Sequence, residues 1–152
     1  MNRFKITQEG YNKLQNDLDD YSNVQRPAII QAIVAARELG DLKENEEYHT
    51  SKDKQKFIDS QIAKLSEILA NAEIVDTSKT KSSKIEFGAK IKLLNTTTNK
   101  EVVYQLVSEY ESSLENGKLA IESPLGKNLT GKEVGDDAKA GANVYEILEI
   151  TY

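Results

Sequence analysis

The amino-acid sequence predicts an α+β fold, in which a long antiparallel hairpin of two helices is followed by a small antiparallel sheet. Apolar residues recur every three or four positions through the first half of the chain, which is the period of helices that pack together. The second half changes to strand-like alternation, and the Ser/Thr/Lys-rich stretch "DTSKTKSSK" separates the two patterns. We therefore expect a coiled-coil domain at 1–76 with an acidic tip at 40–47, a linker at 77–84 and a second domain at 85–152.

The first predicted helix begins at Thr7, because threonine side chains cap helix N-termini. Its apolar positions are spaced by 3, 4 and 3 residues: Tyr11, Leu14, Leu18 and Tyr21. This rhythm slips between Asn23 and Pro27, where we expect a kink or short break because proline removes a helical hydrogen bond. The apolar face resumes at Ile29 and continues to Leu39.

The second predicted helix has an uninterrupted seam whose spacings alternate between 3 and 4 residues, as in a coiled coil. The seam positions are Tyr48, Ser51, Gln55, Ile58, Ile62, Leu65, Leu69 and Ala72. A helix of about 30 residues is ~45 Å long, and two such helices joined by a short bend form an antiparallel hairpin. Because the seam is polar beside the bend, the end near residue 41 is expected to be a thin prong with little core of its own.

Strands and one short helix are predicted in the second half. Three segments have strand-like composition: "AKIKLLN" (89–95), "EVVYQLV" (101–107) and "KLAIES" (118–123). Ser123 followed by Pro124 is typical of a helix N-terminus, and we expect this helix to run through Leu129. A last strand with a bulge is expected in "NVYEILEITY" at the end of the chain.

The composition excludes several kinds of site. The net charge of −5 argues against nucleic-acid binding by electrostatics over the whole chain. The absence of cysteine excludes disulfides and thiolate zinc sites, and the single histidine, His49, argues against a histidine triad. No apolar run approaches the roughly 20 residues that span a bilayer, and the N-terminus has no signal-peptide core, so we expect a cytoplasmic protein. The helical seam is satisfied within the hairpin, so we also expect a monomer.

The bend between the two helices carries an excess of negative charge. The stretch "RELGDLKENEEYH" holds five carboxylates: Glu38, Asp41, Glu44, Glu46 and Glu47. Complementation of the helix dipole explains the last three, which we expect in the first turn of the second helix, but it does not explain Asp41. Asp41 and Glu44 lie three residues apart, so both carboxylates can point off the tip together. Such a pair suits Mg²⁺, although a partner would have to supply the remaining ligands.

The segment "GDLKENEEYH" resembles the tip of bacterial Gre-type transcript cleavage factors, closer to the GreA type than to the GreB type. The stretches "RPAIIQAI", "NAEIVD", "IEFGAKIKLLN" and "ESPLGKNLTGKEVGD" resemble the same family in the same order, so the likeness covers essentially the whole chain. The resemblance implies an N-terminal antiparallel coiled coil and a C-terminal domain of FKBP-like fold.

The resemblance also implies a function. In this family the C-terminal domain docks on RNA polymerase beside its secondary channel, and the coiled coil carries the tip acids down that channel. The family stimulates the polymerase's own endonucleolytic cleavage of backtracked RNA, which lets arrested elongation complexes resume synthesis. The implied role is that of an accessory factor, not a free-standing enzyme. Its implied partners are RNA polymerase, the 3′ end of backtracked RNA and, through a weak contact, the DNA of the elongation complex.

Residue roles follow from the match to the family's motif. Asp41 and Glu44 are the candidate catalytic acids and would hold Mg²⁺ jointly with the polymerase, so the ion is not expected on the isolated protein. Arg37 and Lys52 match basic positions that contact RNA phosphates, although a solvated helix face is the plainer explanation of either residue. The residues expected to support the tip are Gly40, Leu42, Asn45 and Tyr48.

Three alternatives stay open at this point. Glu46 stands where the family usually has a small residue, and the added carboxylate fits a related factor that binds the channel and inhibits the polymerase. The intact pair Asp41 and Glu44 favours cleavage stimulation. An FKBP-like isomerase or chaperone with a coiled-coil handle is a candidate from another class, and the absence of tryptophan argues against it. A simple coiled-coil adaptor would make substitutions at the tip silent.

Overall fold

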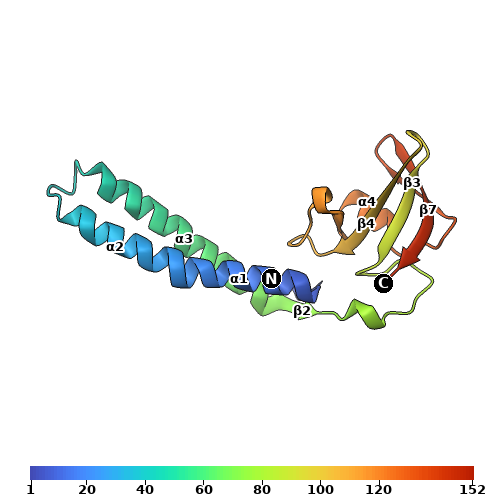
Figure 1. Ribbon diagram of the computed structural model, residues 1–152, viewed down its shortest axis with the longest axis horizontal. Helices are drawn as coiled ribbons and strands as arrows, with labels where there is room; N and C mark the ends of the chain where they lie inside the picture. Colours follow the sequence, from blue (N-terminus) through green and yellow to red (C-terminus); the bar gives the residue numbers. More distant parts are fainter. The chain divides into compact units, whose positions relative to one another are not determined.

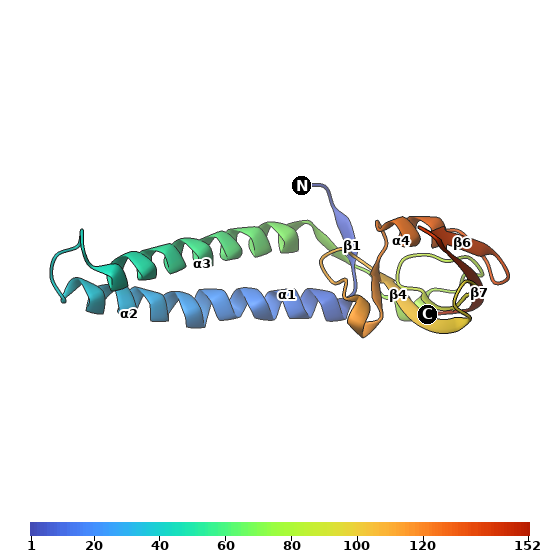
Figure 2. The same cartoon turned by 90° about the horizontal axis from the view of Figure 1, so that it is seen from above.

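Two long helical segments run antiparallel in the first of two units of the chain (Figures 1 and 2). The computed structural model describes residues 1–152; one unit comprises Met1–Asn2 and Tyr11–Ala72, and the other Arg3–Gly10 and Glu73–Tyr152. The outgoing segment consists of α1 (Gln8–Asp20), a π-helical turn η1 (Tyr21–Gln25) and α2 (Arg26–Arg37). The returning segment is the single helix α3 (Glu46–Asn71), whose 26 residues make it about 39 Å long.

A kink or short break was expected between Asn23 and Pro27, and the helix is not broken there, because a π-helical turn accommodates the slip in the seam. The Arg26 N–H donates to the Tyr21 carbonyl, five residues back, and the helix continues into α2. Continued alternation after Tyr21 would place the seam at residues 28, 32 and 35, whereas the buried residues lie one position later, at Ile29, Ile33 and Ala36. A π-turn accommodates one extra residue, so it realigns the apolar face without ending the helix.

The hairpin core confirms the predicted coiled-coil seam. Every predicted seam position of α3 is buried or half-buried. Ile29, Ile33 and Ile58 form a buried cluster, against which Tyr21, Tyr48 and Ile62 pack. Arg26 and Asp59 form an ion pair across the two helices, with 2.9 Å between Nε and Oδ1. Between this cluster and the tip, Ala36 is the one buried residue, so the tip end of the hairpin is as thin as expected.

The second unit contains a five-stranded sheet with the strand order β5-β4-β3-β7-β6. Its strands are β3 (Lys90–Asn95), β4 (Lys100–Val107), β5 (Lys118–Ala120), β6 (Asp137–Ala140) and β7 (Asn143–Thr151). Two short strands, β1 (Phe4–Ile6) and β2 (Ala72–Ile74), form a separate pair, and 3-10 turns lie at Thr77–Lys79 and Leu114–Asn116.

The sheet differs from the sequence-based expectation in two respects. First, β4 and β5 pair in parallel, while all other pairings of the sheet are antiparallel. Second, the sequence did not predict β6, nor β1 and β2 of the separate pair. These strands have only three or four residues, too few for a recognisable alternation. The expected bulge in the last strand is present, because Lys92 pairs with Glu149 whereas the next residue, Leu93, pairs with Ile147.

The short helix α4 (Pro124–Leu129) confirms the predicted cap and covers the sheet core. The Ser123 side chain accepts a hydrogen bond from the Gly126 N–H at 3.1 Å. Leu125 and Leu129 of α4 are buried in the same cluster as the core residues of the sheet, which include Ile91, Leu93, Leu106 and Ile147.

None of the helices of the chain combines the length and the apolar character needed to cross a bilayer.

The C-terminal residue Tyr152 holds the segment that precedes the sheet. Its phenol donates to the Lys84 carbonyl at 2.6 Å and accepts from the Glu86 N–H at 3.0 Å. Burial raises the pKa of this phenol, so the neutral form that makes both hydrogen bonds persists over the whole neutral range.

Glu111 holds residues of the Arg3–Gly10 segment, which belongs to the same unit as the sheet. Its carboxylate accepts hydrogen bonds from the Thr7 N–H at 3.3 Å, from the Thr7 hydroxyl, and from the N–H and hydroxyl of Ser108 at 3.1 and 2.9 Å. The Thr7 hydroxyl in turn accepts from the Gly10 N–H at 3.0 Å, which confirms Thr7 as the N-cap. A Cβ on Gly10 would lie 2.1 Å from the Glu111 carboxylate, so glycine leaves the room that this contact needs.

We expect Glu111→Ala to lower the free energy of unfolding of the chain by about 2–3 kcal/mol, because it leaves the buried Thr7 and Ser108 without their acceptor. Urea denaturation followed by circular dichroism measures this change. The matched control is Glu109→Ala, which removes an exposed carboxylate from the same loop. Equal unfolding midpoints for the two variants would contradict the assignment.

Candidate functional site at the hairpin tip

The loop that joins α2 to α3, which we call the tip loop (residues 38–45), lies at the end of the hairpin where the two helices turn back (Figure 1). The last turn of α2 closes with hydrogen bonds from Leu39 N–H to the Ala36 carbonyl and from Gly40 N–H to the Arg37 carbonyl. Gly40 has a φ of +117°, and no atom lies within 4 Å of the position that a Cβ would occupy. Glycine is therefore required here by the backbone conformation and not by a lack of space.

Asn45 joins the two helix ends. Its side-chain oxygen accepts from the Tyr48 N–H at 3.0 Å and so caps α3, while its Nδ2 donates to the Ala36 carbonyl at 2.5 Å near the end of α2. One side chain thereby satisfies an orphan donor of one helix and a carbonyl of the other. Because Asn45 is the cap, α3 begins at Glu46, and the expectation that Glu44 would lie in its first turn was wrong.

The candidate acids Asp41 and Glu44 are both exposed on the tip loop. Asp41 Oδ1 accepts from the Lys43 N–H at 3.0 Å, which closes a small turn and leaves Oδ2 free. The Lys43 carbonyl lies 3.0 Å from His49 Nε2 in α3. No group of three or more His, Asp or Glu side chains in the chain could hold a metal ion. Two exposed carboxylates can therefore contribute only part of a metal site.

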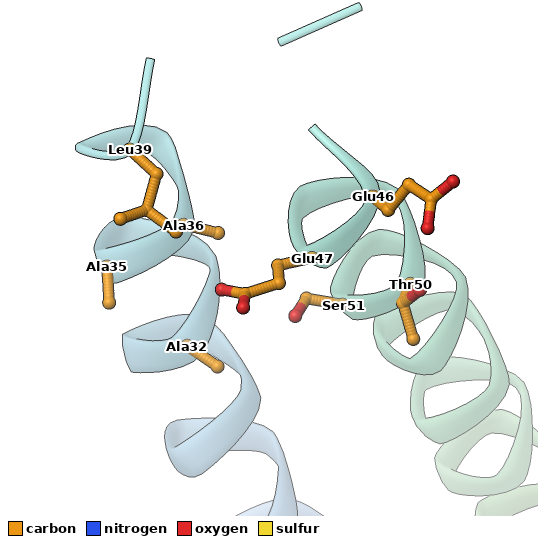
Figure 3. A pocket seen from close by; sticks show the side chains of 8 residues that line it. All are labelled: Ala32, Ala35, Ala36, Leu39, Glu46, Glu47, Thr50 and Ser51. Carbon is orange, nitrogen blue, oxygen red and sulfur yellow. The ribbon is translucent and has the colours of Figure 1, made fainter. Parts of the chain in front are cut away.

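The two acids at the start of α3 point in different directions. In Figure 3, Glu47 points from α3 toward α2, while Glu46 points away from α2. Glu47 enters a groove between the helices that is lined by Ala32, Ala35, Ala36, Leu39, Glu46, Glu47, Thr50 and Ser51 (Figure 3). Both residues occupy the first turn of α3, where negative charge complements the helix dipole.

The candidate RNA-binding residues lie close to the tip on both helices. The Arg37 guanidinium, at the end of α2, lies 5.8 Å from the centroid of the Tyr48 ring. Lys52, one turn beyond Tyr48, is half-buried, and its Nζ lies 3.4 Å from the Gln55 side-chain oxygen. Tyr48 is half-buried and packs on the hairpin core, so its place fits a supporting role. Leu42, by contrast, is 43% exposed and does not pack against the cluster of Ile29, Ile33 and Ile58.

Asn45 and His49 were expected to shape the turn or cap the second helix, but their partners across the tip loop could not be predicted from the sequence. The hydrogen bond from His49 to Lys43 and that from Asn45 to Ala36 both cross the tip loop. A sequence-based signal existed only for the cap, since Asn before a run of acidic and apolar residues is typical of a helix start.

The chain thus combines a helical hairpin that carries exposed acids at its tip with a mostly antiparallel sheet. Residues 4–74 match the family model described as "Transcription elongation factor, N-terminal", and residues 79–152 match "Transcription elongation factor, GreA/GreB, C-term". The chain belongs to the GreA/GreB family of transcription elongation factors.

Individual relatives are similar to this chain over almost the full length of both proteins. The chain is 42% identical to transcription elongation factor GreA of Hyphomonas neptunium, with 100% of this chain and 99% of the relative covered. It is 45% identical to GreA of Thermodesulfovibrio yellowstonii, with 99% and 98% covered. Among solved structures, GreA factor homolog 1 of Thermus thermophilus aligns with a TM-score of 0.46 at 21% identity, with 99% of each chain covered. The two family models and the two GreA relatives show that the chain is a transcription elongation factor, as the resemblance of its motifs implied.

Proposed function

We propose that the protein binds RNA polymerase at its secondary channel and stimulates the polymerase's intrinsic endonucleolytic cleavage of backtracked RNA. In this role it is an accessory factor that rescues arrested elongation complexes, with Asp41 and Glu44 as its catalytic acids. Membership of the GreA/GreB family supports the proposal. We further propose that it works as a monomer in the cytoplasm and contacts the DNA of the elongation complex only weakly.

The observation that carries the proposal is the place of Asp41 and Glu44. Both carboxylates are exposed on a loop at the end of a hairpin about 39 Å long. Acids in such a position can act only on something that surrounds the tip. A deeply buried active centre of a partner is a target that requires a support of this length.

The donor chemistry of the tip fits Mg²⁺. Asp41 and Glu44 would hold the ion together with oxygen ligands from the polymerase and the RNA, since Mg²⁺ prefers carboxylate oxygens and keeps several non-protein ligands. The chemistry that Mg²⁺ supplies to such a site is neutralisation of phosphate charge and a water of lowered pKa. The chain itself contributes the two carboxylates, a turn that orients Asp41 through the Lys43 N–H, and an acceptor that can orient a water.

The basic residues near the tip would guide the RNA. Arg37 and Lys52 lie on the two helices within about two turns of the acids, where they can form charge-assisted hydrogen bonds to phosphate oxygens. The stacking of Arg37 over Tyr48 limits the freedom of its guanidinium, which reduces the entropic cost of binding.

The test of the proposed function is a cleavage assay on purified, backtracked elongation complexes. Addition of the protein should produce Mg²⁺-dependent release of a 3′-terminal RNA fragment, while the protein alone should leave free RNA intact. Slower nucleotide addition without any cleavage would instead identify an inhibitor that binds the same channel. Cleavage of free RNA, or no effect on the polymerase, would reject the proposal.

We expect Arg37→Gln and Lys52→Ala each to slow cleavage about tenfold, because each removes a charge-assisted hydrogen bond to the RNA backbone. The rate of RNA cleavage in the same complexes measures the effect. Lys64→Ala is the matched control, since Lys64 is an exposed lysine of the same helix, 12 residues beyond Lys52 and about 18 Å away along it. If all three variants behaved alike, the two residues would be ordinary solvated charges.

A further inference from the structure

His49 is a residue of the tip that has no role among the proposed metal-binding acids or the proposed RNA-binding residues. It lies in the first turn of α3, and its Nε2 is 3.0 Å from the Lys43 carbonyl oxygen in the tip loop. A carbonyl oxygen can only accept, so the imidazole must carry its proton on Nε2 and donate this hydrogen bond. The donor role is the same for the neutral Nε2–H tautomer and for the imidazolium.

The Lys43 peptide links this histidine to the proposed acids. Lys43 lies between Asp41 and Glu44 in the chain, and its N–H donates to Asp41 Oδ1 at 3.0 Å. Its carbonyl, at the other end of the same residue, accepts from His49. A continuous path of two hydrogen bonds therefore runs from the Asp41 carboxylate through Lys43 to α3.

This path is the main attachment of the acid-bearing part of the loop. Residues 41–44 form one side-chain hydrogen bond to either helix, and it is the bond from His49 to the Lys43 carbonyl. Asn45 joins the helix ends to each other, but it lies outside this segment. His49 is itself held in place, since its N–H donates to the Asn45 carbonyl at 3.1 Å and its ring packs edge-on against Tyr48.

We infer that His49 is a positioning residue, which acts through the Lys43 carbonyl to hold Asp41 and Glu44 in one orientation. Exposed carboxylates on a free loop would have to be ordered at each encounter with the partner, and that ordering reduces the fraction of productive complexes. A hydrogen bond from a rigid helix removes part of this cost before binding. The effect of His49 on cleavage rests on the proposed function of the two acids, whereas its effect on the order of residues 41–44 does not.

The first arm of the test uses the isolated protein. Backbone ¹⁵N relaxation should show that His49→Ala increases fast motion at residues 41–44, while His49→Gln retains the wild-type values, because glutamine places an N–H donor the same number of bonds from Cα. The Tyr48 amide, which donates to the Asn45 cap, should stay equally protected from exchange in all variants. Unchanged fast motion at residues 41–44 in His49→Ala would overturn the inference. Loss of exchange protection at the Tyr48 amide in the same variant would overturn it too, because it would show that His49 stabilises the cap of α3 and not the loop alone.

The second arm uses backtracked polymerase complexes. His49→Ala should raise the Mg²⁺ concentration for half-maximal cleavage about fivefold, the equivalent of one neutral hydrogen bond, with unchanged affinity for the polymerase. His49→Gln should restore it to within about twofold, and Thr50→Ala, which removes an exposed neighbour without a hydrogen bond to residues 41–44, should match the wild type. Wild-type Mg²⁺ dependence in His49→Ala would overturn the inference. Failure of the wild-type protein to stimulate cleavage would instead reject the proposed function and leave the relaxation result standing.

Discussion

Replacement of both Asp41 and Glu44 by alanine is expected to reduce the stimulation of RNA cleavage at least about 100-fold, because the two oxygen ligands that the tip offers to Mg²⁺ are removed together. Both side chains are exposed, so the hairpin should keep its fold and the polymerase its affinity for the factor. The cleavage rate in backtracked complexes and a competition-binding measurement test the two halves of this prediction.

The controls for this prediction separate charge from shape. Asp41→Asn keeps the oxygen that accepts from the Lys43 N–H, so it preserves the turn while it removes the charge, and it should still lose most of the activity. Glu46→Ala removes a neighbouring acid that points away from α2, and it should leave cleavage within about twofold of wild type (Figure 3). Wild-type cleavage by the double variant would show that the acids are not catalytic. An equal loss in Glu46→Ala would show that only the total charge of the tip matters.

Ile58→Ala is expected to have the largest effect on stability, a loss of about 2–5 kcal/mol in the free energy of unfolding, because it creates a cavity in the hairpin core. Ile58 is fully buried between Ile29 and Ile33, and the core toward the tip is too thin to compensate. Thermal unfolding monitored by the helical circular dichroism signal measures this loss. Cleavage stimulation should fall at the temperatures where the helical signal does, since the hairpin carries the acids.

The matched control is Ile30→Ala, the same truncation on the neighbouring helix at a side chain that is 38% exposed. It should cost less than about 1 kcal/mol. If both variants unfolded at the same temperature, the cluster around Ile58 would not be the main source of hairpin stability.

The helical hairpin was predictable because its signal is long and periodic. Every predicted seam position from Tyr48 to Leu69 in α3, and Ala72 just after it, is buried or half-buried as expected, and the caps at Thr7 and Ser123 are present. The slip of the seam between Asn23 and Pro27 predicted a kink or short break, and the structure has a π-helical turn at Tyr21–Gln25 without a break. A seam that slips by one residue can end a helix or pass through a π-turn, and the packing of Ile29 and Ile33 on Ile58 decides between these outcomes.

The sheet was predictable only in part. Strands with clear alternation, such as β3 and β4, lie within one residue of their expected bounds. The parallel pairing of β5 with β4 could not be inferred, because three residues carry no information about direction. It depends on where the chain returns after the turn at Leu114–Asn116 and on the core that α4 and the sheet build together.

At the tip, residue types and spacing were sufficient to identify Asp41 and Glu44 as a pair of exposed acids, because exposure and charge at a bend follow from local sequence. The tertiary structure decided how that pair is held. Hydrogen bonds from His49 to the Lys43 carbonyl and from Asn45 to the Ala36 carbonyl depend on where two antiparallel helices end relative to each other. That relation is set by the packing along the whole hairpin, which the local pattern of the loop does not contain.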